Sequence, residues 1–323
     1  MRMSGYVIRR ILEMIPVVLI VIVFNFTLIH LAPGDPVTIL AGEAGTREYV
    51  EATRKRYGLD EPIYKQLAIY LINVLRGDLG YSFAHSRPVL ELIIEKTPAT
   101  LLLVLTSQSL SIVFGTILGA FCARRYRTKT DYVISFLSLI MYSIPGYWLG
   151  LILILVFGIG LRVFPIWGMI SAGAGFTGID YIKDILWHLF LPALTLSAAW
   201  LTPLFTRIAR SSVIEVMKED YITVARAKGL TENTIFFKHA LRNALIPTVT
   251  QAGLILGFVL GGALMTETIF AWPGLGRFMY ESIFRRDYPV LMGLFLVTSL
   301  CVVAAGLITD IIYGFLDPRV VYK

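Results

Sequence analysis

Six stretches of the 323-residue chain are apolar for long enough to cross a lipid bilayer as helices. A helix needs about 20 predominantly apolar residues to do so. The chain is 56% hydrophobic and only 16% charged, whereas a soluble domain carries about 25% charged residues. Because the apolar excess must lie in lipid, we predict an all-α membrane protein with six transmembrane helices. These lie at 11–31, 99–122, 132–157, 188–205, 245–270 and 290–315.

Pro145 interrupts the third of these stretches, and Pro192 and Pro203 fall inside the fourth, which is also the shortest. Neighbouring helices or water can satisfy the freed carbonyls, so bends are expected. The first stretch could instead be a cleaved signal peptide. Its apolar run exceeds the roughly 7–15 residues of a signal core and no Ala-x-Ala-like site follows it, so an uncleaved span is predicted.

The distribution of basic residues predicts the orientation of these spans. With a cytoplasmic N-terminus, sixteen Lys and Arg residues fall in the inner segments and the C-terminal tail, against five in the short outer loops. Basic residues favour the cytoplasmic side, and long outer segments count weakly in this rule. We therefore predict that both termini are cytoplasmic. The net charge of +7 then reflects topology, and a nucleic-acid partner is not expected, whereas membrane lipid is.

Four regions follow from this topology. Residues 1–32 form an N-terminal tail and the first span, 33–98 an extracytoplasmic helical segment, 99–316 a five-helix core, and 317–323 a cytoplasmic tail. Within the outer segment, helices are expected at 46–57 and 62–75. Loops longer than about 12–15 residues are usually functional or disordered. The helical pattern favours a folded outer cap, with a structural plug as the alternative.

The core contains a basic inner loop, 207–243, that predicts two helices separated by a glycine. Val213, Met217, Tyr221 and Val224 recur at helical spacing and predict one apolar stripe. Gly229 can end this helix in a left-handed conformation, and Thr231 can cap the next helix, with Glu232 in its first turn. The alternative is a hairpin lying on anionic lipid, which would usually carry Trp or Phe anchors; the first helix has neither.

Sequence signals for catalysis are absent from the chain. It has no Gly-x-x-x-x-Gly-Lys-Ser/Thr loop and no Gly-x-Ser-x-Gly elbow, and none of its four histidines stands at metal-ligand spacing. No catalytic residue, metal or cofactor is therefore predicted. Span centres also lack the ionisable residues that ion-coupled carriers use. Polar residues in or near spans can bond between helices or line a path; the path candidates are Gln108, Tyr142, Gln251 and Glu267.

Several motifs resemble one family of transport proteins. The sequences DYITVARAKGL at 220–230 and HALRNA at 239–244 are similar to the cytoplasmic EAA loop of binding-protein-dependent ABC importer permeases, and in particular to the dipeptide/oligopeptide/nickel branch. The resemblance continues in order along nearly the whole chain. Its other matches are RR at 9–10, PGDP at 33–36, GDLG at 77–80, TETIFAWPGLG at 266–276, RDYPV at 286–290 and DPR at 317–319.

One position departs from the family pattern. The glutamate that begins the general EAA motif, thought to help engage the ATPase, corresponds to Thr223. Glu219 or Asp220 could replace it, or Arg226 and Lys228 could face acidic groups on the partner. The resemblance implies an ATPase-coupling set made of Glu219, Asp220, Tyr221, Thr223, Ala225, Arg226, Ala227, Lys228, Gly229, His239, Arg242 and Asn243.

The resemblance also implies an assembly and a location. A type I importer permease would pair with a second homologous permease as a heterodimer, two cytoplasmic ATPases and an external substrate-binding protein, in the inner (plasma) membrane of a prokaryote. The implied substrate is a dipeptide or oligopeptide, with nickel, a metal chelate or glutathione as alternatives. ATP hydrolysis would belong to the partner subunits, so the chain itself is not expected to be an enzyme. An ion-coupled secondary transporter and a non-transport scaffold are remote alternatives.

Overall fold

The computed structural model describes residues 3–31, 61–82, 84–260 and 263–316, and these are predominantly helical. The predicted helix at 62–75 is confirmed as α4, whereas that at 46–57 lies outside the described residues. The helices are α1 (Met3–Leu31), α4 (Ile63–Leu75), α5 (Val89–Arg124), α6 (Lys129–Ser143), α7 (Gly146–Leu153), α8 (Gly178–Leu196), α9 (Thr202–Val216), α10 (Asp220–Ala227), α11 (Glu232–Thr234), α12 (Leu241–Leu260), α13 (Leu264–Ile269), α14 (Leu275–Phe284) and α15 (Tyr288–Leu316), with π-helical turns η1 (Ile154–Gly160), η2 (Ser197–Leu201) and η3 (Ile235–Ala240).

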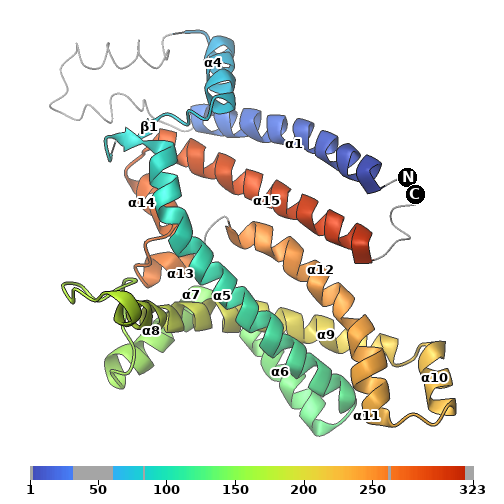
Figure 1. Cartoon of the computed structure of the whole chain (residues 1–323). Coiled ribbons are helices and arrows are strands. Elements are labelled where there is room, and N and C mark those ends of the chain that lie inside the picture. The colour runs from blue at the N-terminus through green and yellow to red at the C-terminus, as the bar shows by residue number, and fades with distance from the viewer. Residues whose placement is uncertain (1–2, 32–60, 83, 261–262, 317–323) are drawn as a thin grey trace.

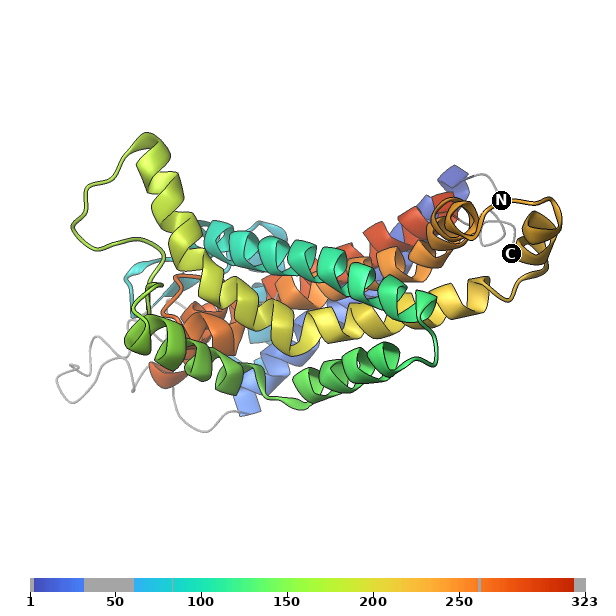
Figure 2. The ribbon, with the colours of Figure 1, turned by 90° about the horizontal axis from the view of Figure 1, so that it is seen from below.

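The long helices form an elongated bundle with two distinct ends (Figures 1 and 2). One end, here called the loop end, carries α10 and α11, the turn between α5 and α6, the start of α1 and the end of α15. The other, the hairpin end, carries α13, α14 and a two-stranded antiparallel hairpin of β1 (Tyr81–Ser82) and β2 (Arg87–Pro88), in which Tyr81 faces Pro88. The long helix α5 runs from the hairpin end to the loop end, and α9 packs along it.

Three helical stretches among the described residues are long and apolar enough to cross a membrane: Val89–Arg124, Gly178–Val216 and Tyr288–Ile308. A fourth exists if α6 and the helix from Gly146 to Gly160 are one span. The predicted first and fifth spans are also helical, as α1 and α12. The described apolar part of α1 is the shorter run Ile11–Thr27. Six spans therefore stay a prediction.

The third predicted span is not gently bent but broken, with α6 and the following helix meeting at 98°. Proline disfavours the helical conformation of the residue before it. Ile144 accordingly has a ψ of 127° and Pro145 also has a ψ of 127°, so two successive residues are extended. One extended residue ends α6 and the next starts α7, which turns the chain through this large angle.

The fourth predicted span proves to be the longest rather than the shortest, because Gly178–Val216 is helical throughout. Pro192 lies inside α8, and Pro203 lies in the first turn of α9, directly after η2. A proline lacks the N–H that would continue the i to i−4 ladder. The wider π-helical turn at Ser197–Leu201 lets the helix pass this position without ending.

The fifth predicted span is too long, because its last residues belong to a separate short helix at the hairpin end. Helix α12 ends at Leu260, and α13 begins at Leu264. In α13 the Glu267 carboxylate is fully buried and accepts hydrogen bonds from the Thr100 hydroxyl at 2.8 Å and from the Arg277 N–H at 3.0 Å. This one side chain therefore joins α5, α13 and α14.

A buried carboxylate also fastens the β-hairpin to the turn before α15. Asp287 is 1% exposed and accepts hydrogen bonds from the Ser82 hydroxyl at 2.6 Å and from the Ala84 N–H at 3.1 Å. Gly80 precedes the hairpin with a φ of +88°, a conformation that favours glycine. Leu79 of the GDLG motif at 77–80 also packs against the apolar cluster that contains Val290, so this motif and the RDYPV motif at 286–290, far apart in sequence, form one structural unit.

Removing the Ser82 hydroxyl should destabilise the hairpin end. A Ser82→Ala variant removes the 2.6 Å bond to the buried Asp287 carboxylate, which costs about 1–3 kcal/mol. Thermal unfolding of the purified protein in detergent should show a lower midpoint. Ser86→Ala, on the same hairpin with an exposed side chain, is the control. Equal midpoints for the two variants would contradict the importance of this contact.

Candidate functional site

The segment 207–243 does not continue as one helix from α9 but turns at Met217–Glu219. Helix α9 ends at Val216, Glu219 is extended with a ψ of 148°, and α10 begins at Asp220. The predicted apolar stripe running from Val213 to Val224 is therefore wrong, since its members lie on two separate helices. The four apolar residues keep helical spacing in the sequence although the helix breaks between α9 and α10. The spacing of apolar residues does not reveal this break.

Helix α10 buries a different face from the one predicted. Ile222 is fully buried and Ala225 is 7% exposed, and both pack with Ile235 and Ala240 of η3. Tyr221 and Val224 are instead 40% and 52% exposed. Of the predicted coupling residues, Ala225 therefore belongs to the chain's own core. Those exposed to solvent are Glu219, Asp220, Tyr221, Thr223, Arg226, Ala227, Lys228, Gly229, Arg242 and Asn243.

The predicted helix ends in this loop are confirmed. Gly229 has a φ of +78°, a left-handed conformation that ends α10, and the N–H of Leu230 bonds to the Ala225 carbonyl at 3.3 Å. The Thr231 hydroxyl then caps α11 by accepting from the Thr234 N–H, with Glu232 in the first turn. These local signals fix where α10 stops and how the chain returns toward the bundle.

Polar contacts join α10 to the helices that follow it. The Asn243 amide donates to the Tyr221 hydroxyl at 2.8 Å, and this hydroxyl donates to the His239 carbonyl at 3.4 Å. Arg226 forms an ion pair with Glu232 at 2.8 Å. The guanidinium lowers the pKa of the Glu232 carboxyl, mainly through this hydrogen bond. Because the folded-state pKa is lowered, the pair contributes at neutral pH and is lost only as acid protonates Glu232.

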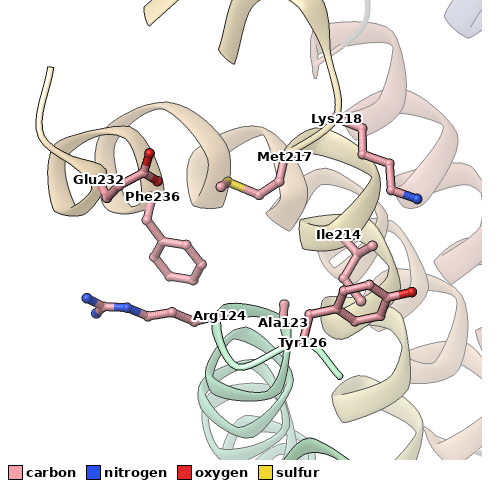
Figure 3. Close-up of a pocket in the computed structure, with 8 residues that line it drawn as sticks. All are labelled: Ala123, Arg124, Tyr126, Ile214, Met217, Lys218, Glu232 and Phe236. Carbon is pink, nitrogen blue, oxygen red and sulfur yellow. The ribbon is translucent and has the colours of Figure 1, made fainter. Parts of the chain in front are cut away.

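A hollow of about 350 Å³ separates this loop from the end of α5 (Figure 3). Arg124, the last residue of α5, spans its edge and donates to the Asn233 side-chain oxygen at 2.6 Å. Its guanidinium also lies 5.7 Å from the centroid of the Phe236 ring. The hollow is lined by Ala123, Arg124, Tyr126, Ile214, Met217, Lys218, Glu232 and Phe236.

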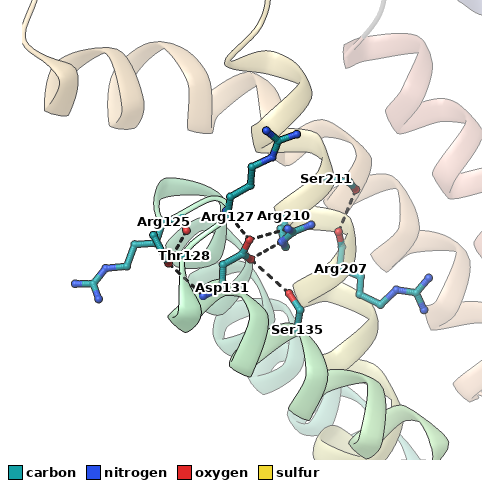
Figure 4. Close-up of polar contacts among 8 residues, drawn as sticks. All are labelled: Arg125, Arg127, Thr128, Asp131, Ser135, Arg207, Arg210 and Ser211. Carbon is teal, nitrogen blue, oxygen red and sulfur yellow. Dashed lines mark hydrogen bonds and ion pairs between the residues drawn. The ribbon is translucent and has the colours of Figure 1, made fainter.

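The start of α6 is tied to α9 beside this loop by a buried ion pair (Figure 4). The Arg210 guanidinium donates from Nε and Nη2 to the two oxygens of Asp131, at 2.6 and 2.8 Å. The Asp131 side chain is 1% exposed and that of Arg210 28%. Sequence reasoning counted Arg210 only as a basic loop residue and missed Asp131. The one sequence feature that points to Asp131 is its position three residues after Thr128, the cap of α6.

The four path candidates do not converge on one point. Gln108 is 4% exposed and donates from Nε2 to the Ala252 carbonyl, next to the half-buried Gln251. The Tyr142 ring is 38% exposed and lies 5.7 Å from the Arg207 guanidinium. Glu267 is enclosed at the hairpin end. Gln108 and Gln251 therefore mark one interhelical region, and the other two lie elsewhere.

The fold and the loop together define the class of protein. A chain of the MetNI methionine ABC transporter, in an inward-facing conformation, has the same fold with a TM-score of 0.51 at 21% identity, over 68% of this chain and 96% of that one. This is the fold of type I ABC importer permeases. The structure thus has the type I importer permease fold, with a helical loop at one end.

The chain belongs to the family described as binding-protein-dependent transport system inner membrane component, which matches residues 115–322. The N-terminal membrane component of the same systems matches residues 3–104. The oligopeptide transport system permease protein AppB of Bacillus subtilis is 41% identical over 99% of this chain and all of its own length. The glutathione transport system permease protein GsiC of Escherichia coli K12 is 38% identical with the same coverage. The chain is an inner-membrane permease subunit of a binding-protein-dependent ABC importer.

Proposed function

We propose that the chain forms half of a translocation path for peptides, together with a second homologous permease in a heterodimer. Two cytoplasmic ATPases drive the pair, and an external binding protein delivers the substrate. The family supports the general plan. The names of AppB and GsiC support peptides as the substrate class, since one is an oligopeptide permease and the other a permease for glutathione, itself a small peptide.

The proposed topology has six spans with the loop end in the cytoplasm. The start of α1 and the end of α15 lie at the same end as α10, in line with two termini on one side of the membrane (Figure 2). The basic residues concentrated at this end favour the cytoplasmic side. The described residues of the outer segment, 61–82 and 84–98, then lie with the hairpin end on the opposite face. We propose that the outer segment shapes the entry and contacts the binding protein.

The arrangement of α10 is the observation that carries the proposal for ATPase coupling. Buried Ile222 and Ala225 hold one face of the helix on η3, while Tyr221, Val224 and the residues around Lys228 stay open to solvent at the loop end. A short helix fixed on one side and exposed on the other can enter a cleft on a partner without unfolding. We assign this exposed face to contact with the ATPase.

A charged substitution on the exposed face of α10 tests the assignment. Val224→Arg adds bulk and charge where the side chain is 52% exposed, so the fold of α10 should be retained. In the assembled importer, association with the ATPase and uptake should fall about tenfold or more. Phe284→Arg, at the hairpin end and 71% exposed, should leave association with the ATPase unchanged. Normal association in the Val224→Arg importer would remove α10 from the interface.

The substrate class is tested in proteoliposomes that hold the complete importer with its own binding protein. Uptake of a radiolabelled tripeptide should be saturable, ATP-dependent and reduced by unlabelled oligopeptides. Competition by glutathione alone would favour the glutathione alternative. Failure of every peptide to compete would exclude peptides as the substrate.

A further inference from the structure

The ion pair between Asp131 and Arg210 is a strongly directional contact at the loop end. Both carboxylate oxygens accept from one guanidinium in a two-pronged arrangement, which fixes the relative orientation of the groups as well as their distance. A lysine could supply the charge but not this two-pronged hydrogen bonding, which is called the fork below. The contact joins residues that stand 79 positions apart in the sequence. It therefore links two elements that no local interaction brings together.

Asp131 also organises the start of α6. Its Oδ2 atom accepts from the Arg127 N–H at 3.1 Å, and its Oδ1 atom accepts weakly from the Ser135 hydroxyl at 3.4 Å (Figure 4). The Thr128 hydroxyl caps the same turn. Because one carboxylate serves both the first turn of α6 and Arg210, a displacement of Arg210 acts directly on the start of α6.

Each helix of this pair leads to a part of the chain with a distinct role. Arg210 lies on α9 less than two turns before Val216, where the chain turns into α10. Asp131 lies in the first turn of α6, the helix that ends at the 98° bend before Pro145. The ion pair thus stands between the proposed ATPase-contacting helix and the broken span.

A buried ion pair is weak evidence for a purely stabilising role. Removing charges from water costs several kcal/mol per ion, and apolar residues of similar volume often stabilise as well or better. Apolar residues, however, would let α9 slide along α6, whereas the fork holds one register. The geometry favours a role in holding that register over a role in stability alone.

We propose that Asp131 and Arg210 are positioning residues that hold α9 in register with the start of α6, so that movement of α10 reaches the bent span α6–α7. This rests on the proposed function, in which an ATPase moves α10. Loss of the fork should then lower the amount of substrate taken up per ATP hydrolysed, even in a folded and assembled importer. Packed contacts of this kind switch between discrete arrangements rather than deforming smoothly.

The test is a double-mutant cycle in the reconstituted importer, with Asp131→Asn, Arg210→Met and the two combined. Arg210→Met leaves an unpaired buried charge and should lower both the unfolding temperature and uptake per ATP. The double variant has no unpaired charge and should recover the unfolding temperature. Its uptake per ATP should stay about tenfold below normal. Recovery of both quantities would reduce the pair to a structural contact and overturn the proposal.

Two further variants keep the test decisive. Arg210→Lys retains the charge without the fork and should fold, yet lose a measurable part of uptake per ATP; normal coupling in this variant also overturns the proposal. Lys129→Met removes an exposed cation from the same turn of α6 and should change neither quantity. Association with the ATPase, measured on every sample, separates a failure of docking at α10 from a failure of this contact.

Discussion

Replacing Glu267 with alanine should unfold the hairpin end of the chain. The side chain is fully buried, and its carboxylate accepts from Thr100 on α5 and from the N–H of Arg277 on α14. The Thr100 hydroxyl in turn accepts from the Leu275 N–H at 2.7 Å. Without the carboxylate, a buried hydroxyl and a backbone N–H lose their acceptor and a cavity forms. The combined cost is about 3–5 kcal/mol, a large share of the stability of most domains.

The measurement is the temperature at which detergent-purified protein loses its monodisperse peak in size-exclusion chromatography. Glu267→Gln keeps the shape and one oxygen acceptor, so its midpoint should fall between those of the alanine variant and the parent. Glu281→Ala is the matched control, because that glutamate lies at the same end, is 35% exposed and pairs only at the surface with Arg277. A Glu267→Ala protein that keeps its midpoint but loses uptake would instead place Glu267 on the translocation path.

The sequence predicts local features of this fold well. Hydropathy locates the long helices because lipid forces backbone groups to bond within each segment. The turn at Gly229 and the cap at Thr231 are also predicted, since each depends on residues within one or two turns. Both are confirmed by the φ of +78° at Gly229 and by the hydrogen bond from Thr234.

The features that were missed depend on contacts between distant segments. A proline at 145 predicts a helix boundary, but the 98° angle depends on two successive extended residues and on how the following helix packs. The buried face of α10 is set by Ile235 and Ala240 of η3, not by the spacing of apolar residues in α10 itself. Asp131 and Arg210 meet across 79 positions, a pairing that a single sequence does not show.

The contact between α5 and α9 should tolerate very little added volume. A Cβ atom on Gly119 would lie 2.5 Å from the Thr206 carbonyl oxygen and 2.7 Å from the Ala209 Cβ, and a Cβ atom on Gly115 would lie 2.6 Å from the Phe205 Cβ. The nearest atoms of α9 are backbone and Cβ atoms, which cannot move as the end of a flexible side chain can. The added atom therefore has no flexible neighbour to displace. The helices must separate, and Gly119→Leu should cost more than the usual 1–3 kcal/mol of overpacking.

Gly306 provides the matched control, because it also lies in a long apolar helix but, in the part of the chain that the structure describes, nothing stands within 4 Å of the position where its Cβ would be. Gly119→Ala and Gly119→Leu should lower the unfolding temperature in graded steps, whereas the same two changes at Gly306 should leave it nearly constant. Ala209→Gly should rescue Gly119→Ala only in part, because it removes one clash and leaves the Thr206 carbonyl in place. Equal effects at both glycines would mean that α5 and α9 are not held this closely. Since α9 continues into the turn before α10, a separation of these two helices should lower uptake together with stability, unlike loss of the Asp131–Arg210 pair in the double variant.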